Sequence, residues 1–192
     1  MTVTEDWRTA WQPVIDAVGT DFGGGEVVAG ADSVDASALR RFLEPLEFDC
    51  PLHHDQRVAR EHGFPGVIAP FSSYFTFVAP PIWRPGDAQV FTSDERDAQP
   101  EGVAVRRFLT GLEPPHTGYF AADFEVDLFL PVALGDRLTR NGMKLVSCRP
   151  KETSVGRGAF MTWQWEVLNQ RSELVARLRN TMYVYSPHAD GS

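Results

Sequence analysis

Residues 120–130, FAADFEVDLFL, alternate apolar side chains with small or acidic ones over most of their length. In an extended chain the apolar members face one way and the carboxylates face the other. The apolar set consists of Phe120, Ala122, Phe124, Val126, Leu128 and Leu130. The stretch therefore predicts a long, half-buried β-strand.

Two further runs rich in β-formers follow this strand. They span residues 158–168 and 174–185, and the polar connection 169–172 joins them. The pair Gly135-Asp136 predicts a turn before them. The C-terminal half is therefore expected to form an antiparallel sheet.

The N-terminal half has helical patterns instead. Trp7, Trp11 and Val14 recur at helical spacing, and the glycines after residue 18 end the pattern, so residues 1–30 predict an amphipathic helix and a turn. Asp35 can cap a second helix, which Pro45 limits. We expect helices before the strands.

The apolar run 71–78 predicts a buried central helix. Residues 82–102 are rich in proline and polar residues without a steady period, and they predict a long surface loop. Helices followed by a meander of strands indicate an α+β fold in which the sheet wraps around the helix of residues 71–78. We expect residues 1–192 to form a single domain.

Composition limits the class of protein. The chain has 192 residues, 43% of them hydrophobic, and a formal net charge of −8. This charge argues against nucleic acid or an anionic membrane as the main partner. No apolar run approaches the roughly 18 residues of a membrane span, and the first residues do not resemble a signal peptide. We expect a cytoplasmic protein.

Most of the candidate chemistry lies in residues 48–55, FDCPLHHD. His53 and His54 can titrate near neutral pH, and the flanking carboxylates could orient an imidazole. A plainer interpretation makes His54 and Asp55 part of a helix N-cap. We expect no metal site, because adjacent histidines on a short loop rarely converge on one ion.

The same region carries a resemblance to a known family. The motif Pro51-Leu52-His53, followed by Phe64 and by Val67-Ile68-Ala69, resembles that of MaoC-like (R)-specific enoyl-thioester hydratases and dehydratases. Residues 130–138 and 169–176 extend the resemblance over nearly the whole chain, which looks most similar to acyl dehydratase domains of the fatty-acid-synthase type. The resemblance implies a single hot-dog domain.

The resemblance to this family also implies a function. We expect reversible hydration of a 2-enoyl thioester, or dehydration of the 3-hydroxyacyl thioester, carried by coenzyme A or a carrier protein, without a redox cofactor. His53 occupies the position of the family's catalytic histidine. Phe48 occupies the position of its aspartate, and the Phe71 amide that of its oxyanion donor. Further substrate contacts are expected at Phe64, Ile68, Ser72 and His54.

Because Phe48 cannot activate water, two alternatives stay open. In the first, Asp49 supplies the missing carboxylate and completes a catalytic pair with His53. In the second, the chain is a non-catalytic hot-dog subunit that shapes the acyl pocket of a heteromer, whose partner carries the intact Asp and His. We also consider an acyl-binding module without turnover. Pairing with a second hot-dog chain, identical or different, is expected in each case.

Overall fold

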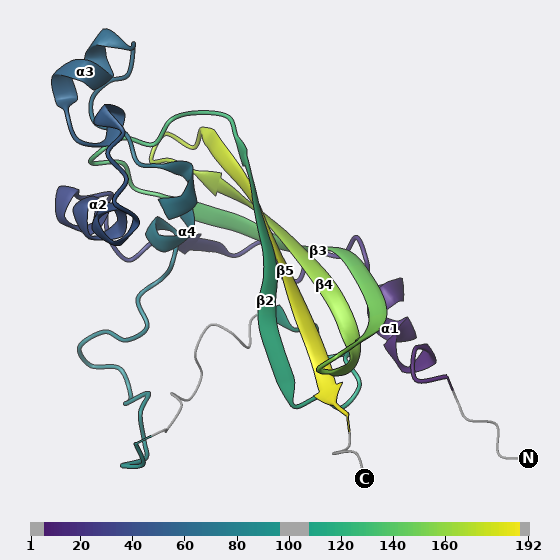
Figure 1. Ribbon diagram of the computed structural model, residues 1–192. Coiled ribbons are helices and arrows are strands. Elements are labelled where there is room, and N and C mark those ends of the chain that lie inside the picture. Colours follow the sequence, from purple (N-terminus) through teal and green to yellow (C-terminus); the bar gives the residue numbers. More distant parts are fainter. Residues whose placement is uncertain (1–5, 97–107, 189–192) are drawn as a thin grey trace, which may run out of the picture.

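The computed structural model describes residues 6–96 and 108–188. Its sheet has five antiparallel strands in the order β1-β3-β4-β5-β2 (Figure 1). The strands are β1 (Val27–Ala29), β2 (Gly118–Leu128), β3 (Thr139–Thr153), β4 (Gly156–Leu168) and β5 (Leu174–Pro187). The antiparallel C-terminal sheet is confirmed, with β1 added from the N-terminal part.

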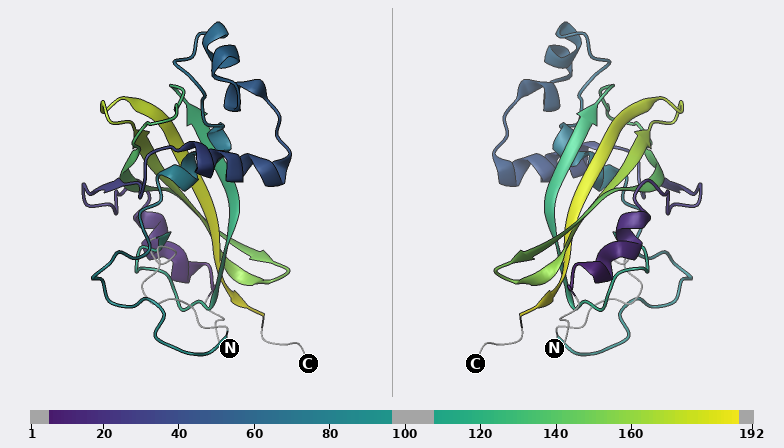
Figure 2. Two further views of the ribbon diagram at one scale, coloured as in Figure 1. Left: turned by 90° about the vertical axis from the view of Figure 1, so that its left-hand side faces the viewer. Right: turned by 90° about the vertical axis from the view of Figure 1, so that its right-hand side faces the viewer.

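The helices lie around this sheet and are short. Figure 1 shows α2, α3 and α4 near one end of the sheet and α1 beside β3, and Figure 2 shows the same arrangement from two sides. The α-helices are α1 (Gln12–Asp16), α2 (Ala36–Leu43), α3 (Gln56–Glu61) and α4 (Tyr74–Phe77). The 3-10 helices are η1 (Thr9–Trp11), η2 (Glu44–Leu46), η3 (Pro51–His53) and η4 (Phe71–Ser73). Within the two described ranges, none of them has the length and apolarity of a membrane span.

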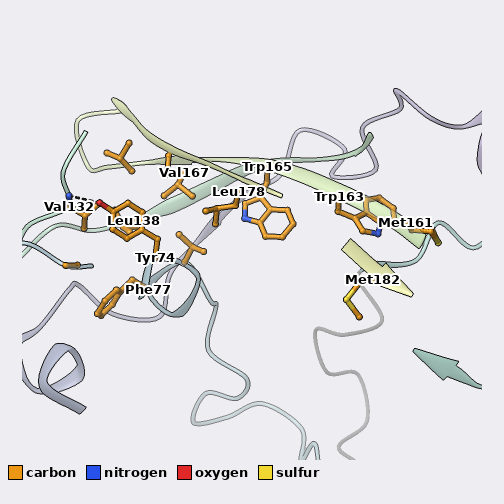
Figure 3. Packing of buried hydrophobic residues seen from close by; sticks show 14 of the residues in the cluster. Tyr74, Phe77, Val132, Leu138, Met161, Trp163, Trp165, Val167, Leu178 and Met182 are labelled. Carbon is orange, nitrogen blue, oxygen red and sulfur yellow. Dashed lines mark hydrogen bonds between the residues drawn. The ribbon is translucent and has the colours of Figure 1, made fainter. Parts of the chain in front are cut away.

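The core lies between the sheet and α4. Along the middle of β4, alternate residues such as Trp163 and Trp165 are buried and the others half-buried, so one face of this strand supplies the core. Trp165 pairs with the buried Leu178 of β5. Tyr74 and Phe77 of α4 belong to the same cluster (Figure 3). The α+β arrangement of a sheet around an apolar helix is confirmed.

Side-chain caps fix the start of two helices. The Asp35 carboxylate accepts hydrogen bonds from the amides of Ser37 and Ala38, at 2.8 and 3.0 Å. These amides have no acceptor inside the helix, so the cap stabilises the first turn of α2. The cap predicted from the sequence is confirmed.

The central helix differs from its prediction in burial. Residues 71–77 are helical, as η4 followed by α4, and Tyr74 and Phe77 are 2% and 6% exposed. Phe71 and Phe75 are 56% and 37% exposed. The predicted central helix is therefore buried along the side that carries Tyr74 and Phe77 and exposed at Phe71 and Phe75.

Strand β2 also departs from its prediction. A β-bulge shifts its register between Ala121 and Asp123, so Phe120 pairs with Tyr183 while Phe124 pairs with Asn180. Positions 183 and 180 face opposite sides of β5, and therefore Phe120 and Phe124 also face opposite sides. The strict alternation predicted from residue 120 onward was wrong at Phe120.

Nor is β2 half-buried within the described structure. Phe124 and Leu128, on the face that continues the core, are 39% and 52% exposed. The sequence pattern identified the apolar face correctly, but the described residues of this chain cover that face only in part.

The segments outside the core follow the predictions only broadly. The N-terminal helix is reduced to η1 and α1, from which Trp11 and Val14 enter the core. Residues 82–96 form neither helix nor strand, as expected of the long loop. The rest of that predicted loop, residues 97–102, lies outside the described residues.

Candidate active site

An apolar cavity of about 620 Å³ lies between η3, η4 and the end of β2. Its wall combines three parts of the chain that are distant in sequence. The lining residues are Leu46, Phe48, His53, Phe64, Ile68, Ala69, Pro70, Phe71, Ser72, Tyr74, Leu128, Phe129, Leu130 and Pro131. A cavity of this size with few polar groups suits an acyl chain better than a charged ligand.

His53 is fixed in the cavity wall by contacts with residue 68. The Ile68 amide donates to the Leu52 carbonyl oxygen at 3.2 Å, and His53 Nδ1 lies 2.7 Å from the Ile68 carbonyl oxygen. Because a carbonyl only accepts, Nδ1 must carry the proton. In the neutral ring Nε2 is then the proton acceptor, and it has no hydrogen-bond partner within the described residues.

Phe48, which occupies the position of the family's aspartate in the motif, lies beside His53. Its ring stacks on the imidazole, with 5.5 Å between ring centroids and an interplanar angle of 29°. The contact orients the imidazole by packing and brings no charge or hydrogen-bonding group to it. His53 is therefore held by a backbone carbonyl and an aromatic ring.

The structure does not bring Asp49 or His54 into this cavity. Both line a separate shallow depression beside α2. His54 Nε2 lies 2.8 Å from the Phe48 carbonyl oxygen, so this second imidazole supports the loop. The alternative that made Asp55 a helix cap is confirmed, since its carboxylate accepts from the amides of Arg57 and Val58. These two bonds hold the pKa of Asp55 below its usual value.

The remaining expected contacts do line the cavity. Phe64, Ile68, Phe71 and Ser72 are all in its wall. Phe71 is the first residue of η4, where an amide has no acceptor inside the helix. The N–H group predicted to act as oxyanion donor is thus free of intrahelical bonding.

Comparison with known proteins assigns the family. Residues 17–178 match the model described as "FAS1-like, dehydratase domain region".

The chain belongs to this FAS1-like dehydratase family.

A curated relative from Thermomonospora curvata, named "Probable enoyl-CoA hydratase alpha subunit", is 26% identical over 163 residues. The match covers 85% of this chain and 48% of the relative, so this chain spans about half the relative's length.

Solved structures share the fold of this FAS1-like dehydratase region. A chain of the ChsH1-ChsH2 complex from Mycobacterium tuberculosis superposes with a TM-score of 0.62 at 20% identity, covering 96% of this chain and 94% of that one. A chain of the HadBC (3R-hydroxyacyl-ACP dehydratase) complex from the same organism gives 0.55 at 18% identity, covering 83% and 95%. A MaoC-like dehydratase from Rhodospirillum rubrum gives 0.51 at 23% identity, covering 86% and 94%. These likenesses confirm the predicted hot-dog fold, and the family match agrees with the predicted resemblance to fatty-acid-synthase-type dehydratase domains.

Sequence reasoning missed two parts of the dehydratase region's cavity. Tyr74, interpreted only as core, accepts a hydrogen bond from the Val132 amide at 3.1 Å and so ties α4 to the segment after β2 (Figure 3). Burial raises the pKa of Tyr74, which keeps it neutral. Residues 128–131 form the opposite wall. The sequence did contain a sign of that wall. Phe129 interrupts the alternation of apolar and polar residues, so that residues 128–130 are three consecutive apolar side chains.

Proposed function

We propose that this chain takes part in the reversible hydration of a 2-enoyl thioester, or the dehydration of the corresponding 3-hydroxyacyl thioester. The observation that carries the proposal is the placement of His53, whose Nδ1 is bonded to the Ile68 carbonyl while the ring lines an apolar cavity. This arrangement leaves Nε2 as an acceptor beside a space with few polar groups. The name of the Thermomonospora curvata relative agrees with this reaction class.

In this mechanism His53 acts as the acid–base group. Nε2 accepts a proton from water, whose oxygen adds to the β-carbon of the enoyl group, and a carboxylic acid donates a proton to the α-carbon, so one imidazole and one carboxyl group share the two transfers. The apolar wall, including Phe64 and Ile68, would hold the acyl chain. The Phe71 amide would stabilise negative charge on the thioester oxygen, and Ser72 would lie beside the carrier end.

The second proton-transfer group is missing from the cavity. Among the described residues that line it, none carries a carboxylate. Asp49 could contribute only if the loop moved, because it lines the separate depression beside α2. This favours a heteromer in which a second hot-dog subunit supplies the carboxylate. The acyl substrate would be carried by coenzyme A or by a carrier protein.

A second candidate function follows from the same observation. Phe48 stacks on His53 and holds the imidazole by packing alone. A subunit that only shapes the acyl pocket of an active partner requires such packing and no proton-transfer group. The two candidates differ in whether His53 takes part in proton transfer.

Hydration of a panel of 2-enoyl-CoA esters tests the proposal, with the chain assayed alone and with candidate hot-dog partners. His53→Ala should lower turnover by about a hundredfold or more, the usual scale of acid–base catalysis. His62→Ala is the matched control, because His62 bonds to the Val58 carbonyl on α3 and does not line the cavity. Full activity of the His53→Ala complex would refute the acid–base role and leave the pocket-shaping function.

Phe48→Asp examines the missing carboxylate directly. The substitution places an acid beside the imidazole that Phe48 now stacks on. We expect it to raise turnover of the chain alone if the carboxylate is what the cavity lacks. Asp49→Asn is expected to leave turnover unchanged, and a loss comparable to that of His53→Ala would show that the loop does deliver Asp49.

A further inference from the structure

The imidazole of His53 is the first member of a series of hydrogen bonds that leads away from the cavity. Its Nδ1–H group donates to the Ile68 carbonyl oxygen at 2.7 Å. The N–H on the other side of that peptide group, at Ala69, donates to the Val132 carbonyl oxygen at 2.7 Å. The N–H of the next peptide group donates to Asp136 Oδ2 at 2.8 Å. Two peptide groups therefore connect the imidazole to a carboxylate, and we call this series the His53–Asp136 network.

The two peptide groups of this network are held in a fixed orientation. Residues 67–69 lie antiparallel to residues 132–134, with a β-bridge between Ile68 and Ala133. In a trans peptide group the C=O and the N–H point in opposite directions, so the two peptide dipoles are aligned head to tail. Their negative ends face the imidazole and their positive ends face the carboxylate.

The carboxylate at the end of the network is buried and has neutral partners. Asp136 is 9% exposed, and its second oxygen accepts from Gln170 Nε2 at 2.9 Å. The Ala133 amide and the Gln170 side chain are both uncharged donors. Val132 and Ala69 are buried as well. In such a low-dielectric setting the members of a hydrogen-bond series polarise one another, by about 10–30% per bond.

The local geometry alone gives Asp136 a role in a turn. The Asp136 amide donates to the Ala133 carbonyl oxygen at 3.1 Å, and the Asp136 carboxylate accepts from the Ala133 amide. This role requires an acceptor oxygen at position 136, which an asparagine side chain also provides. It does not require the negative charge, and the charge therefore distinguishes a turn residue from a residue that acts on His53.

We propose that Asp136 is a positioning residue for His53, and that its charge acts through the two peptide groups of the network. The charge strengthens the bond that holds the imidazole in the Nδ1–H form, and it stabilises the positive charge that the ring acquires when Nε2 accepts a proton. No proton moves along the network, because each peptide N–H keeps its hydrogen. Asp136 does not replace the carboxylic acid that donates to the α-carbon, since it does not line the cavity.

The effect of Asp136 on turnover rests on the proposed function, because only a proton-accepting His53 requires it. The hydrogen bonds of the network do not depend on that function. They can be observed by NMR in the substrate-free chain, so a failure of this inference is distinguishable from a failure of the proposed function.

The first experiment follows the network by NMR in the full chain labelled with nitrogen-15. Asp136→Asn keeps an oxygen acceptor in the turn and removes the charge. It should move the amide protons of Ala133 and Ala69 upfield, as weaker hydrogen bonds do, and lower the fraction of His53 in the Nδ1–H form. Asp21→Asn is the matched control, because the Asp21 carboxylate also accepts from two backbone amides but lies beside β3, and it should leave these signals unchanged.

A second pair of variants changes the charge without altering Asp136. Gln170→Lys places an ammonium group beside the Asp136 carboxylate and should move the same signals in the same direction. Gln170→Ala removes the same side-chain amide without adding a charge and should not. Gln170 is exposed, so we expect both variants to fold.

Hydration of 2-enoyl-CoA esters measures the consequence for His53, with the chain alone or in an active complex. Asp136→Asn should lower kcat by about tenfold and leave KM unchanged, because it weakens acid–base catalysis without altering the cavity wall. Absence of turnover by wild type would count against the proposed function and leave the network to be decided by NMR.

Two results would overturn the inference. The first is a set of unchanged His53 and amide signals in Asp136→Asn and Gln170→Lys, with both variants folded by circular dichroism. The second is an equal change of these signals in Gln170→Ala and Gln170→Lys, which would show that only the turn matters. An unchanged kcat of Asp136→Asn in an active complex would overturn the effect on catalysis.

Discussion

The two edges of the sheet differ in what covers them. At the β3 edge, β1 pairs with residues 139–141 and the segment before it continues the cover. There the Gly19 amide donates to the Leu145 carbonyl at 2.8 Å, and the Leu145 amide donates to Thr20 at 3.0 Å. At the β2 edge no described residue provides such bonds. Among the described residues, the chain therefore closes the β3 edge itself and leaves the β2 edge unpaired, beside the candidate active site.

The largest expected effect is the difference in free energy of unfolding between a Leu→Ala substitution on an inner strand and the same substitution on the open edge. Leu178 on β5 is fully buried, and Leu128 on β2 is 52% exposed. Leu178→Ala should lower the free energy of unfolding by about 3 kcal/mol, because it leaves a cavity in the core. Leu128→Ala should lower it by less than about 1 kcal/mol in the isolated chain.

Urea denaturation of the two variants beside wild type measures both losses. Equal losses would mean that β2 is covered within the isolated chain and that the edges do not differ. For Leu128→Ala we expect the effect to appear in association with a partner instead of in the stability of the chain.

The same contrast shows how far the sequence could go. Period-2 alternation reveals which side of a strand is apolar, and it did so for most of β2. It cannot reveal whether the same chain covers that side, since exposure depends on packing across the whole fold. The bulge that turns Phe120 to the other face was also hidden, because a bulge needs no special residue in the strand.

At the candidate site, local chemistry was predictable and long-range contacts were not. The caps by Asp35 and Asp55 depend on residues two and three positions away. The placement of His53 came from a motif. By contrast, the bond from Val132 to Tyr74 joins residues 58 positions apart, and no local pattern encodes it. The direction taken by Asp49 was equally hidden, because neighbouring loop residues point different ways.

Hydrogen exchange sharpens the comparison of the edges at the level of single amides. In an antiparallel ladder, alternate amides of an edge strand point away from their neighbour. Those of β2 should exchange about a hundredfold faster than the amides of Leu145 and Met143, which are bonded to Thr20 and Asp21. Exchange measured by NMR on the isolated chain tests this, and binding of a partner should slow the β2 amides selectively. Similar rates at both edges in the isolated chain would contradict the proposed difference.

The smallest expected effect concerns Asp21, the side chain that helps to close the β3 edge. Its carboxylate accepts from the amides of Met143 at 2.8 Å and Gly23 at 2.7 Å, and these bonds hold its pKa below the usual value. The folded state therefore favours the ionised form. The resulting stability is fully present above the unfolded pKa of about 3.9 and is lost as the pH falls through the lower folded pKa.

Asp21→Asn should remove this contribution at neutral pH and flatten the acid side of the stability curve. Because Asp21 is exposed, solvent screening limits the loss to less than about 1 kcal/mol. Asp32→Asn is the control, since Asp32 is also exposed and has no hydrogen bond or ion pair among the described residues. Urea denaturation between pH 7 and about pH 3 should separate the two variants only above the unfolded pKa. If they behaved alike at every pH, the Asp21 carboxylate would not help to close the β3 edge, and its closure would depend on the pairing with β1 and on the backbone bonds of Gly19, Phe22 and Leu145.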